Sequence, residues 1–188
     1  MAKRKDISRT DILDAALALL HGRGYQGFSF RDLAGEIGIS SASLHHHFAT
    51  KGDLCAAVVL RYRDGLNRRL AALAAEHDDW SRRWRLTAAL FTRAGRAGDL
   101  LGALAAGFAT LPLPVRQEVV LLHSNLTGWL ARFVTEARRR NELPQECDAE
   151  TLSHSLLALL QGGLLLERLG TPGAMAGMLR QAEEWLGL

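Results

Sequence analysis

The chain has 188 residues, of which 48% are hydrophobic and 23% are charged, and only 4 are prolines. This composition excludes a disordered protein and suffices for one good core, or for a small module joined to a larger one. The formal net charge of +3 excludes a uniformly basic surface. A nucleic-acid contact would therefore depend on local clusters such as Lys3-Arg4-Lys5 and Arg9.

The cysteines and the apolar stretches indicate the compartment. Cys55 and Cys147 are far apart in the sequence, which suits a reducing compartment and gives no metal-ligand spacing. Asp14 interrupts the apolar run after the basic start, and no small-residue cleavage site follows it, so a signal peptide is not predicted. The leucine-rich stretch around Gln161 is too short and too polar to span a bilayer. We expect a cytoplasmic protein with no membrane segment, metal or cofactor.

The first fifty residues are predicted to form three short helices. A hydroxyl residue followed three positions later by an acid marks a capped helix start, and it occurs at Ser8 with Asp11, Ser29 with Asp32, and Thr50 with Asp53. The first helix has an apolar stripe formed by Ile12, Leu13, Ala16, Leu17 and Leu20. Four-residue spacing continues with Leu33 and Ile37, and then with Leu44 and Phe48. Gly38 lies in a tight turn between the second and third helices, which predicts a helix-turn-helix.

The remainder of the chain is also predicted to be helical. A long helix begins at Lys51, with inward positions at Leu54, Val58, Tyr62, Leu66 and Leu73. Further helices are expected over 79–97, 99–110, 114–141, 148–169 and 172–187, with their clearest breaks at the proline-containing segments 111–114 and 141–148. No segment alternates as a strand does. The sequence therefore predicts an all-α protein of about nine helices, with a helix-turn-helix module over 1–50 and a helical bundle over 51–188.

The three consecutive histidines lie on the third helix. If Leu44 and Phe48 point inward, rotation of about 100° per residue turns Ala42 and His46 directly outward. Consecutive histidines fan around a helix and do not converge on one ion, which disfavours a metal site. Small residues near the start of a helix and imidazoles near its end suit a DNA groove, because small side chains permit close approach to base edges.

Residues 8–54 resemble the DNA-binding domain of the tetracycline-repressor (TetR) family of bacterial regulators. The matching features are the alanine-rich first helix, Gly24-Tyr25, Asp32-Leu33-Ala34, Gly38-Ile39-Ser40, Leu44, His46-His47-Phe48 and Lys51. The resemblance implies an all-α homodimer whose third helix reads the major groove and whose C-terminal domain binds a small effector. Ser41 and His45 stand where the family often has lysine and tyrosine, so the operator is not inferred from relatives.

The resemblance also implies roles for individual residues. Ser29 and Lys51 are expected to contact phosphates, the latter together with the free amides that begin the fourth helix. The groups expected to face bases or backbone are Ser41, Ala42, Ser43, His45 and His46, with His47 at the edge. Three simpler interpretations stay open: Ser29 as a helix cap alone, Lys51 as a solvated charge, and His47 packed beside Phe48.

Candidate effector contacts are spread over the second domain. They are Phe91, Phe108, His123, Thr127, Trp129, His154 and Gln161. Each polar member has an alternative as a satisfied core or interface group. Few charged residues fall on the inward faces of 114–141 and 148–169, which favours a mainly apolar effector, with His123 and His154 as its polar contacts. Gly162-Gly163 suggests a close backbone approach, most simply across a dimer interface.

These observations predict a regulator and not an enzyme, since there is no nucleophile motif, phosphate-binding glycine loop or catalytic carboxylate pair. The expected function is a ligand-responsive repressor that binds a palindromic double-stranded DNA operator as a homodimer and is released by the effector. The alternatives are a helix-turn-helix regulator controlled by oxidation of Cys55 or Cys147, or by a protein partner.

Overall fold

The computed structural model describes residues 7–93, 100–143 and 148–188, and in these ranges it contains helices and no strand. The helices are α1 (Arg9–Arg23), α2 (Phe30–Ile37), α3 (Ser41–His47), α4 (Lys51–Glu76), α5 (Trp80–Arg93), α6 (Leu100–Ala105), a 3-10 turn η1 (Phe108–Thr110), α7 (Leu113–Arg139), α8 (Ala149–Arg168) and α9 (Ala174–Leu186). The prediction of an all-α fold is confirmed. The division at residue 50 stays a prediction.

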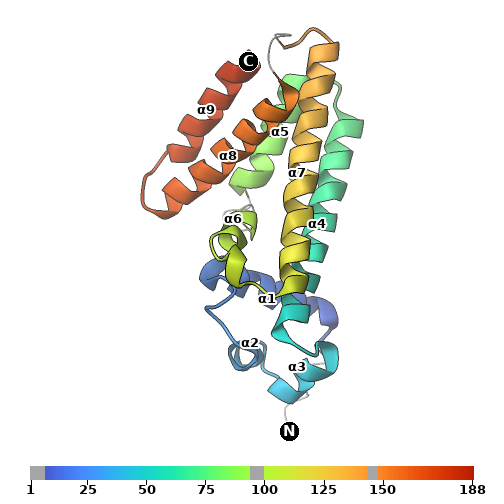
Figure 1. Cartoon of the computed structure of the whole chain (residues 1–188), viewed down its shortest axis with the longest axis vertical. Helices are drawn as coiled ribbons and strands as arrows, with labels where there is room; N and C mark the ends of the chain where they lie inside the picture. The colour runs from blue at the N-terminus through green and yellow to red at the C-terminus, as the bar shows by residue number, and fades with distance from the viewer. Residues whose placement is uncertain (1–6, 94–99, 144–147) are drawn as a thin grey trace.

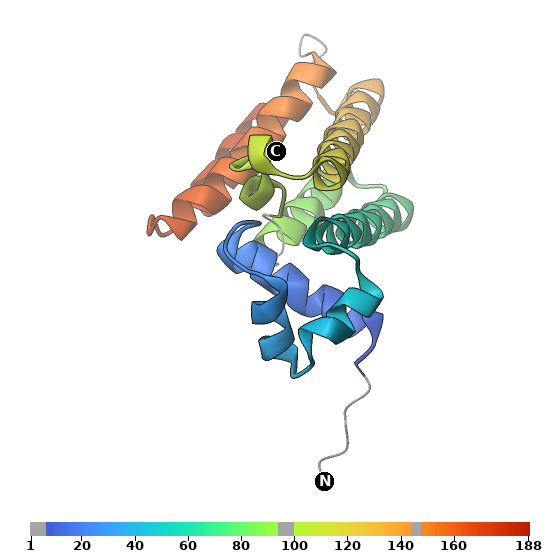
Figure 2. The same cartoon turned by 60° about the horizontal axis from the view of Figure 1, so that its bottom comes forward.

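The helices form a small unit at one end of the molecule and a bundle at the other. Helices α1, α2 and α3 lie at the N-terminal end, below the bundle in Figure 1. The long helices α4 and α7 pack side by side, α8 packs on α7, and α9 packs on α8. Figure 2 shows the same arrangement with the α1–α3 unit brought forward. Helix α4 leads directly from the small unit into the bundle.

The three predicted helix starts are capping boxes. At the start of α4, the Thr50 hydroxyl accepts from the Asp53 amide at 3.1 Å, and the Asp53 carboxylate accepts from the Thr50 amide at 3.0 Å. The same reciprocal pairs begin α1 and α2. Each box satisfies donors that have no partner within the helix. Helix α2 ends at Gly38, whose φ of 74° is left-handed, so the chain turns into α3 at little steric cost.

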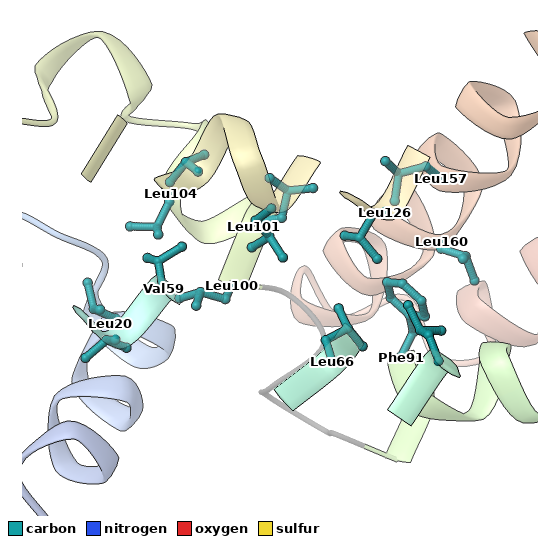
Figure 3. Packing of buried hydrophobic residues seen from close by; sticks show 14 of the residues in the cluster. Leu20, Val59, Leu66, Phe91, Leu100, Leu101, Leu104, Leu126, Leu157 and Leu160 are labelled. Carbon is teal, nitrogen blue, oxygen red and sulfur yellow. The ribbon is translucent and has the colours of Figure 1, made fainter. Parts of the chain in front are cut away.

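A continuous apolar core joins the small unit to the bundle. Leu20 of α1, Val59 of α4 and Leu100 of α6 are fully buried and meet where the two parts join (Figure 3). Farther into the bundle, Phe91, Leu126 and Leu160 belong to the same buried cluster. Burial of this kind stabilises a fold by about 25 cal/mol per Å² of apolar surface. The two parts therefore share one core, with α4 passing through both.

Two details of the sequence prediction were wrong. Leu17 is only half-buried, and Leu19 is buried in α1 instead, because α1 packs against α4 and α6 as well as α2. The helix expected over 99–110 is interrupted: α6 ends at Ala105, and the 3-10 turn η1 follows it. The 3-10 turn is bounded by Gly107, and the amide of Thr110 donates to the Gly107 carbonyl.

The close approach at Gly163 occurs within one chain. A Cβ added there would lie 3.0 Å from the Met175 sulfur and 3.1 Å from the Met175 Cα, both in α9. Gly162 has no atom within 4 Å of its added Cβ. The interpretation of Gly163 as a contact across a dimer interface is therefore wrong. The close approach at Gly163 comes from the tight packing of α8 on α9.

No helix in the described ranges has the length and apolar character needed to cross a membrane.

We predict that Gly163→Leu lowers the free energy of unfolding by about 1–3 kcal/mol, because the side chain overpacks the contact with Met175. Gly162→Leu is the matched control, since its added Cβ meets nothing and leucine favours a helix over glycine. Urea denaturation at equal protein concentration measures both. Equal free energies of unfolding in the two variants would contradict the intrachain contact.

Candidate nucleic-acid interface

Helix α3 is held by its two ends and by its inward residues. The Ser40 hydroxyl caps its start by accepting from the Ser43 amide at 3.1 Å. Leu44 is fully buried and Phe48, just beyond the last turn, is 4% exposed. These anchors leave the opposite face of α3 toward solvent. Ser40 was not among the predicted site residues, although its position before a run of small residues is typical of an N-cap.

The residues predicted to face DNA lie on this outer face. Ala42, His45, His46 and His47 are exposed, and Ser41 and Ser43 are partly buried at the edges of the helix. His47 does not pack beside Phe48, so that alternative was wrong. A seven-residue helix with one buried leucine presents most of its circumference to solvent, including the position of His47.

The three histidines differ in how firmly they are held. The His45 ring packs on the Phe30 ring with centroids 4.8 Å apart, and its Nδ1 lies 3.3 Å from the Ala49 carbonyl. The tautomer that donates from Nδ1 leaves Nε2 as an acceptor. His46 and His47 make no hydrogen bond or ring contact with any described residue. The described residues include no cluster of three or more His, Cys, Asp or Glu side chains that could hold a metal ion.

Both the amide and the hydroxyl of Ser29 form hydrogen bonds with Asp32. Its amide donates to the Asp32 carboxylate at 2.7 Å, its hydroxyl donates to the same carboxylate at 2.7 Å, and the Asp32 amide donates to the hydroxyl at 3.2 Å. The hydrogen bonds from Ser29 lower the pKa of Asp32. This geometry establishes a helix cap. A phosphate contact from Ser29 stays a prediction.

The ammonium group of Lys51 is enclosed by two aromatic rings. Its Nζ donates to the Phe28 carbonyl at 2.6 Å, and it lies 4.3 Å from the Tyr25 ring centroid and 4.7 Å from that of Phe28. Burial lowers the pKa of Lys51. The interpretation of Lys51 as a solvated charge was therefore wrong: it ties the loop before α2 to the start of α4. A phosphate contact from Lys51 stays a prediction.

Additional positive charge lies near α3. The Arg9 guanidinium stacks over the Phe48 ring, 4.8 Å from its centroid. Arg9 and Arg31 are both exposed. The basic segment Lys3-Arg4-Lys5 lies outside the described residues. The α1–α3 unit thus combines an exposed reading face with basic side chains beside it, the combination that protein–DNA interfaces use.

The predicted effector residues do not surround a single cavity. His123 and His154 are both exposed, with parallel rings whose centroids are 6.3 Å apart, and the Thr127 hydroxyl donates to the His123 carbonyl at 3.0 Å. Phe108 lines an open hollow beside α7, while Trp129 stacks on Phe133 and borders two other surface hollows. Only Phe91 and Gln161 reach the bundle interior. His123 and His154 each lie next to the buried stripe of their helix. Helical spacing alone did not predict that these two positions are exposed.

Several side chains of the bundle have a buried polar atom with no hydrogen bond to a described residue. Three of these side chains lie on α5 and α8: the Trp84 indole, the Thr87 hydroxyl and the Gln161 amide. Trp84 and Thr87 are at most 1% exposed. Sequence reasoning missed both, because an indole and a threonine on an apolar stripe are typical of core packing.

An exposed helix after a glycine turn, set on a buried three-helix core, defines a helix-turn-helix DNA-binding module. The family model for the bacterial regulatory proteins of the tetR family matches residues 12–58, and that for the tetracyclin repressor-like C-terminal domain matches residues 67–182. The chain therefore belongs to the TetR family of DNA-binding transcriptional regulators.

Individual relatives span nearly the whole chain. The nucleoid occlusion factor SlmA of Shewanella amazonensis is 26% identical over 165 residues, which are 86% of this chain and 84% of the relative. A TetR-family regulator from Agrobacterium tumefaciens superposes with a TM-score of 0.89 at 26% identity, covering 94% of this chain and 95% of its own. A TetR regulator from Legionella pneumophila gives 0.83 at 27% identity, covering 98% of each chain. These similarities extend over the DNA-binding module and the bundle together.

We predict that Lys51→Met lowers the free energy of unfolding by about 1–3 kcal/mol, because it removes the bond to Phe28 and the contacts with two rings. Affinity for all duplex sequences should fall about equally, since the start of α4 loses its contacts with the loop before α2. Urea denaturation and gel-shift titration measure the two effects.

Arg31→Met is the control for the unfolding measurement on Lys51→Met. It removes one exposed positive charge from the same module and leaves the Lys51 contacts intact. An unchanged free energy of unfolding in Lys51→Met would show that the ammonium contacts do not stabilise the module.

Proposed function

We propose that the protein is a cytoplasmic transcriptional repressor that binds a palindromic operator as a homodimer and releases it when a small, mainly apolar effector enters the bundle. The observation that carries this proposal is the path of α4. Its first residue contacts Tyr25 and Phe28 of the DNA-binding module, and Leu66 and Leu70 are buried farther along it in the bundle. A shift of this one helix would move the reading face. Regulation, with no catalytic step, is the function of the family to which the chain belongs.

DNA recognition is assigned to the outer face of α3. Ala42 and the partly buried Ser41 and Ser43 are small enough to admit base edges, and His46 projects from the centre of the exposed face. One seven-residue helix contacts too few base pairs for useful specificity. Two copies on half-sites about 34–36 Å apart, or a multiple of that, would supply the rest.

We expect His46→Ala to weaken binding to the specific operator by about 1–3 kcal/mol and to leave binding to random duplex nearly unchanged, because it removes a base contact. His123→Ala is the matched control, since it deletes another exposed imidazole, which lies on α7 and not on α3. Gel-shift titrations on both duplexes decide the matter. If His46→Ala binds the operator as tightly as His123→Ala does, His46 is not a reading residue.

The dimer interface is assigned to the apolar surface of α8 and α9. Leu165 is 54% exposed, Leu169 is 73% exposed and Trp185 is 44% exposed. Leu165 and Leu169 lie at the end of α8 next to the turn into α9, and Trp185 lies near the other end of the α8–α9 pair. Exposed large apolar side chains mark interaction sites, and self-association along both helices would bury them with twofold symmetry. This proposal places the partner against the outer surface of α8, away from its contact with α9.

The double variant Leu165→Glu/Leu169→Glu should sediment as a monomer and lose operator affinity, because four carboxylates would be buried in a symmetric interface. Val120→Glu, at a residue 49% exposed on α7, is the control and should stay dimeric. Analytical ultracentrifugation measures both. A double variant that remains dimeric would remove this surface from the interface.

The effector site is assigned to the interior between α5 and α8. These helices are in contact, and Figure 3 shows Phe91 of α5 beside Leu160 of α8. Thr87 is one turn before Phe91, and Gln161 follows Leu160. Leaving a buried polar group unpaired costs about 1–3 kcal/mol, which a ligand recovers by supplying the partner. An apolar compound with a carbonyl or hydroxyl group would supply that partner. Gln161, Thr87 and Trp84 replace the exposed His123 and His154 as its polar contacts.

An effector found by thermal-shift screening of such compounds should lower operator affinity when titrated into the protein–operator complex. The expected coupling is about 1–3 kcal/mol, and the operator must weaken ligand binding by the same factor. Gln161→Leu should lose the ligand response while keeping or raising the melting temperature, because it removes an unpaired buried amide.

Gln181→Leu is the control for Gln161→Leu, since the Gln181 amide is exposed and bonded to Glu184. A compound that binds tightly and leaves operator affinity unchanged would contradict the proposed coupling. A ligand response retained in Gln161→Leu would contradict the placement of the site.

Control by a protein partner is a second candidate, supported by an exposed apolar hollow. Phe108, Leu113, Val120 and Leu121 line a space of about 610 Å³ beside the start of α7. Leu113 is 58% exposed. The similarity to SlmA, a nucleoid occlusion factor, adds a relative whose name describes a role beyond metabolite sensing. Leu113→Glu would abolish capture of a partner bound at this hollow and would leave a response to an interior ligand intact.

Control by oxidation is less well supported. Cys55 is fully buried, and burial raises the pKa of its thiol to about 12. A thiol that stays protonated reacts slowly with oxidants, because the thiolate is the nucleophile. Cys147 lies outside the described residues.

A further inference from the structure

A second hollow lies at the junction between the DNA-binding module and the bundle. It has a volume of about 280 Å³ and is bordered by α1, α4 and α5. Leu13 of α1, together with Val58 and Leu66 of α4, forms an apolar floor, and each of these three residues is no more than 7% exposed. The proposed effector site between α5 and α8 shares none of the residues named here.

The rim of this junction hollow is strongly basic. Arg61, Arg68 and Arg69 border it, with Asp14 as the only acidic lining residue. Arg61 is already held, because its guanidinium donates to the Asp14 carboxylate at 2.6 Å and to the Thr10 carbonyl at 3.1 Å. Within the described ranges, Arg68 and Arg69 have no hydrogen bond or ion pair. Two guanidinium groups are therefore available to an anion at the edge of an apolar floor.

A glycine leaves the hollow open. Gly65 lines it from the middle of α4, where glycine costs about 0.5–1 kcal/mol relative to alanine. A Cβ added at Gly65 would have one near neighbour, the Arg68 guanidinium nitrogen at 3.9 Å. Any larger side chain at this position would project into the space between the floor and the basic rim.

We propose that this junction hollow binds a small amphiphilic organic carboxylate, with its apolar body on the leucine and valine floor and its carboxylate on Arg68 and Arg69. The volume is near the lower end of the range for ligand pockets and about twice that of a cavity that holds benzene, which suits a short acyl chain or two fused rings. The ligand would contact α1 and α4 together. Its carboxylate could also compete with Asp14 for Arg61, the ion pair that joins these two helices.

The proposal is tested by calorimetric titration of the whole protein with 2-naphthoate and octanoate, and with neutral 2-naphthamide. The carboxylates should bind at least about tenfold more tightly than the amide, since each charge-assisted hydrogen bond contributes about 1.5–3 kcal/mol. Arg68→Gln/Arg69→Gln should reduce naphthoate affinity to that of the amide. Gly65→Leu should abolish binding of both naphthyl compounds without lowering the melting temperature.

Two controls locate the bound carboxylate. Arg82→Gln/Arg85→Gln makes the same change in net charge on α5, away from this hollow, and should bind naphthoate as the unmodified protein does. Gln161→Leu should also leave naphthoate binding unchanged. Loss of binding in Gln161→Leu with retention in Gly65→Leu would overturn the proposal and place the compound in the interior effector site. Absence of carboxylate binding at millimolar concentration, or equal binding by the two arginine double variants, would also overturn it.

Discussion

The packing of the first half of α4 against α1 is the contact on which the rest of the structure depends. Leu54, Cys55, Val58 and Val59 are all at most 2% exposed, so this half of α4 belongs to the core of the DNA-binding module. The same helix continues without a break to Glu76 and packs against α7 in the bundle. A ligand-dependent movement in the bundle can reach α3 only through this shared element or through the contacts of α1 with the bundle. The regulation proposed for this protein would depend on the covalent continuity of α4.

The junction between the two parts is built from neutral and paired groups. Burial, with a smaller contribution from Arg168, lowers the pKa of His21 to about 4, so this histidine at the end of α1 is neutral near pH 7. Its ring meets the Tyr62 ring edge-on, with centroids 6.2 Å apart. Arg61 and Asp14 neutralise one another across the same junction. The buried histidine at the junction is therefore neutral, and the charges of Arg68 and Arg69, unpaired among the described residues, are exposed at its rim.

The bundle combines tight packing with buried polar groups that have no partner among the described residues. Gly163 lets α8 approach Met175 of α9 closely, while Trp84 and Thr87 of α5 and Gln161 of α8 carry buried polar groups with no partner among the described residues. A fold optimised only for stability would pair such groups or replace them with apolar ones. These unpaired groups are the ones that the proposed effector would contact. The α8–α9 packing gives that interior a rigid boundary.

The sequence by itself determined the helical class, the capped helix starts, the glycine turn and the outward face of α3. These features depend on residues no more than four positions apart, and local hydrogen bonds and helical periodicity express them directly. The family followed from the same stretch. Tertiary structure decided which groups meet across long separations: Lys51 with Tyr25, and Gly163 with Met175. It also decided that His123 and His154 face solvent while Trp84 and Thr87 do not. Two adjacent residues on a helix point about 100° apart. Which of the two side chains is buried depends on how the neighbouring helices pack against that helix.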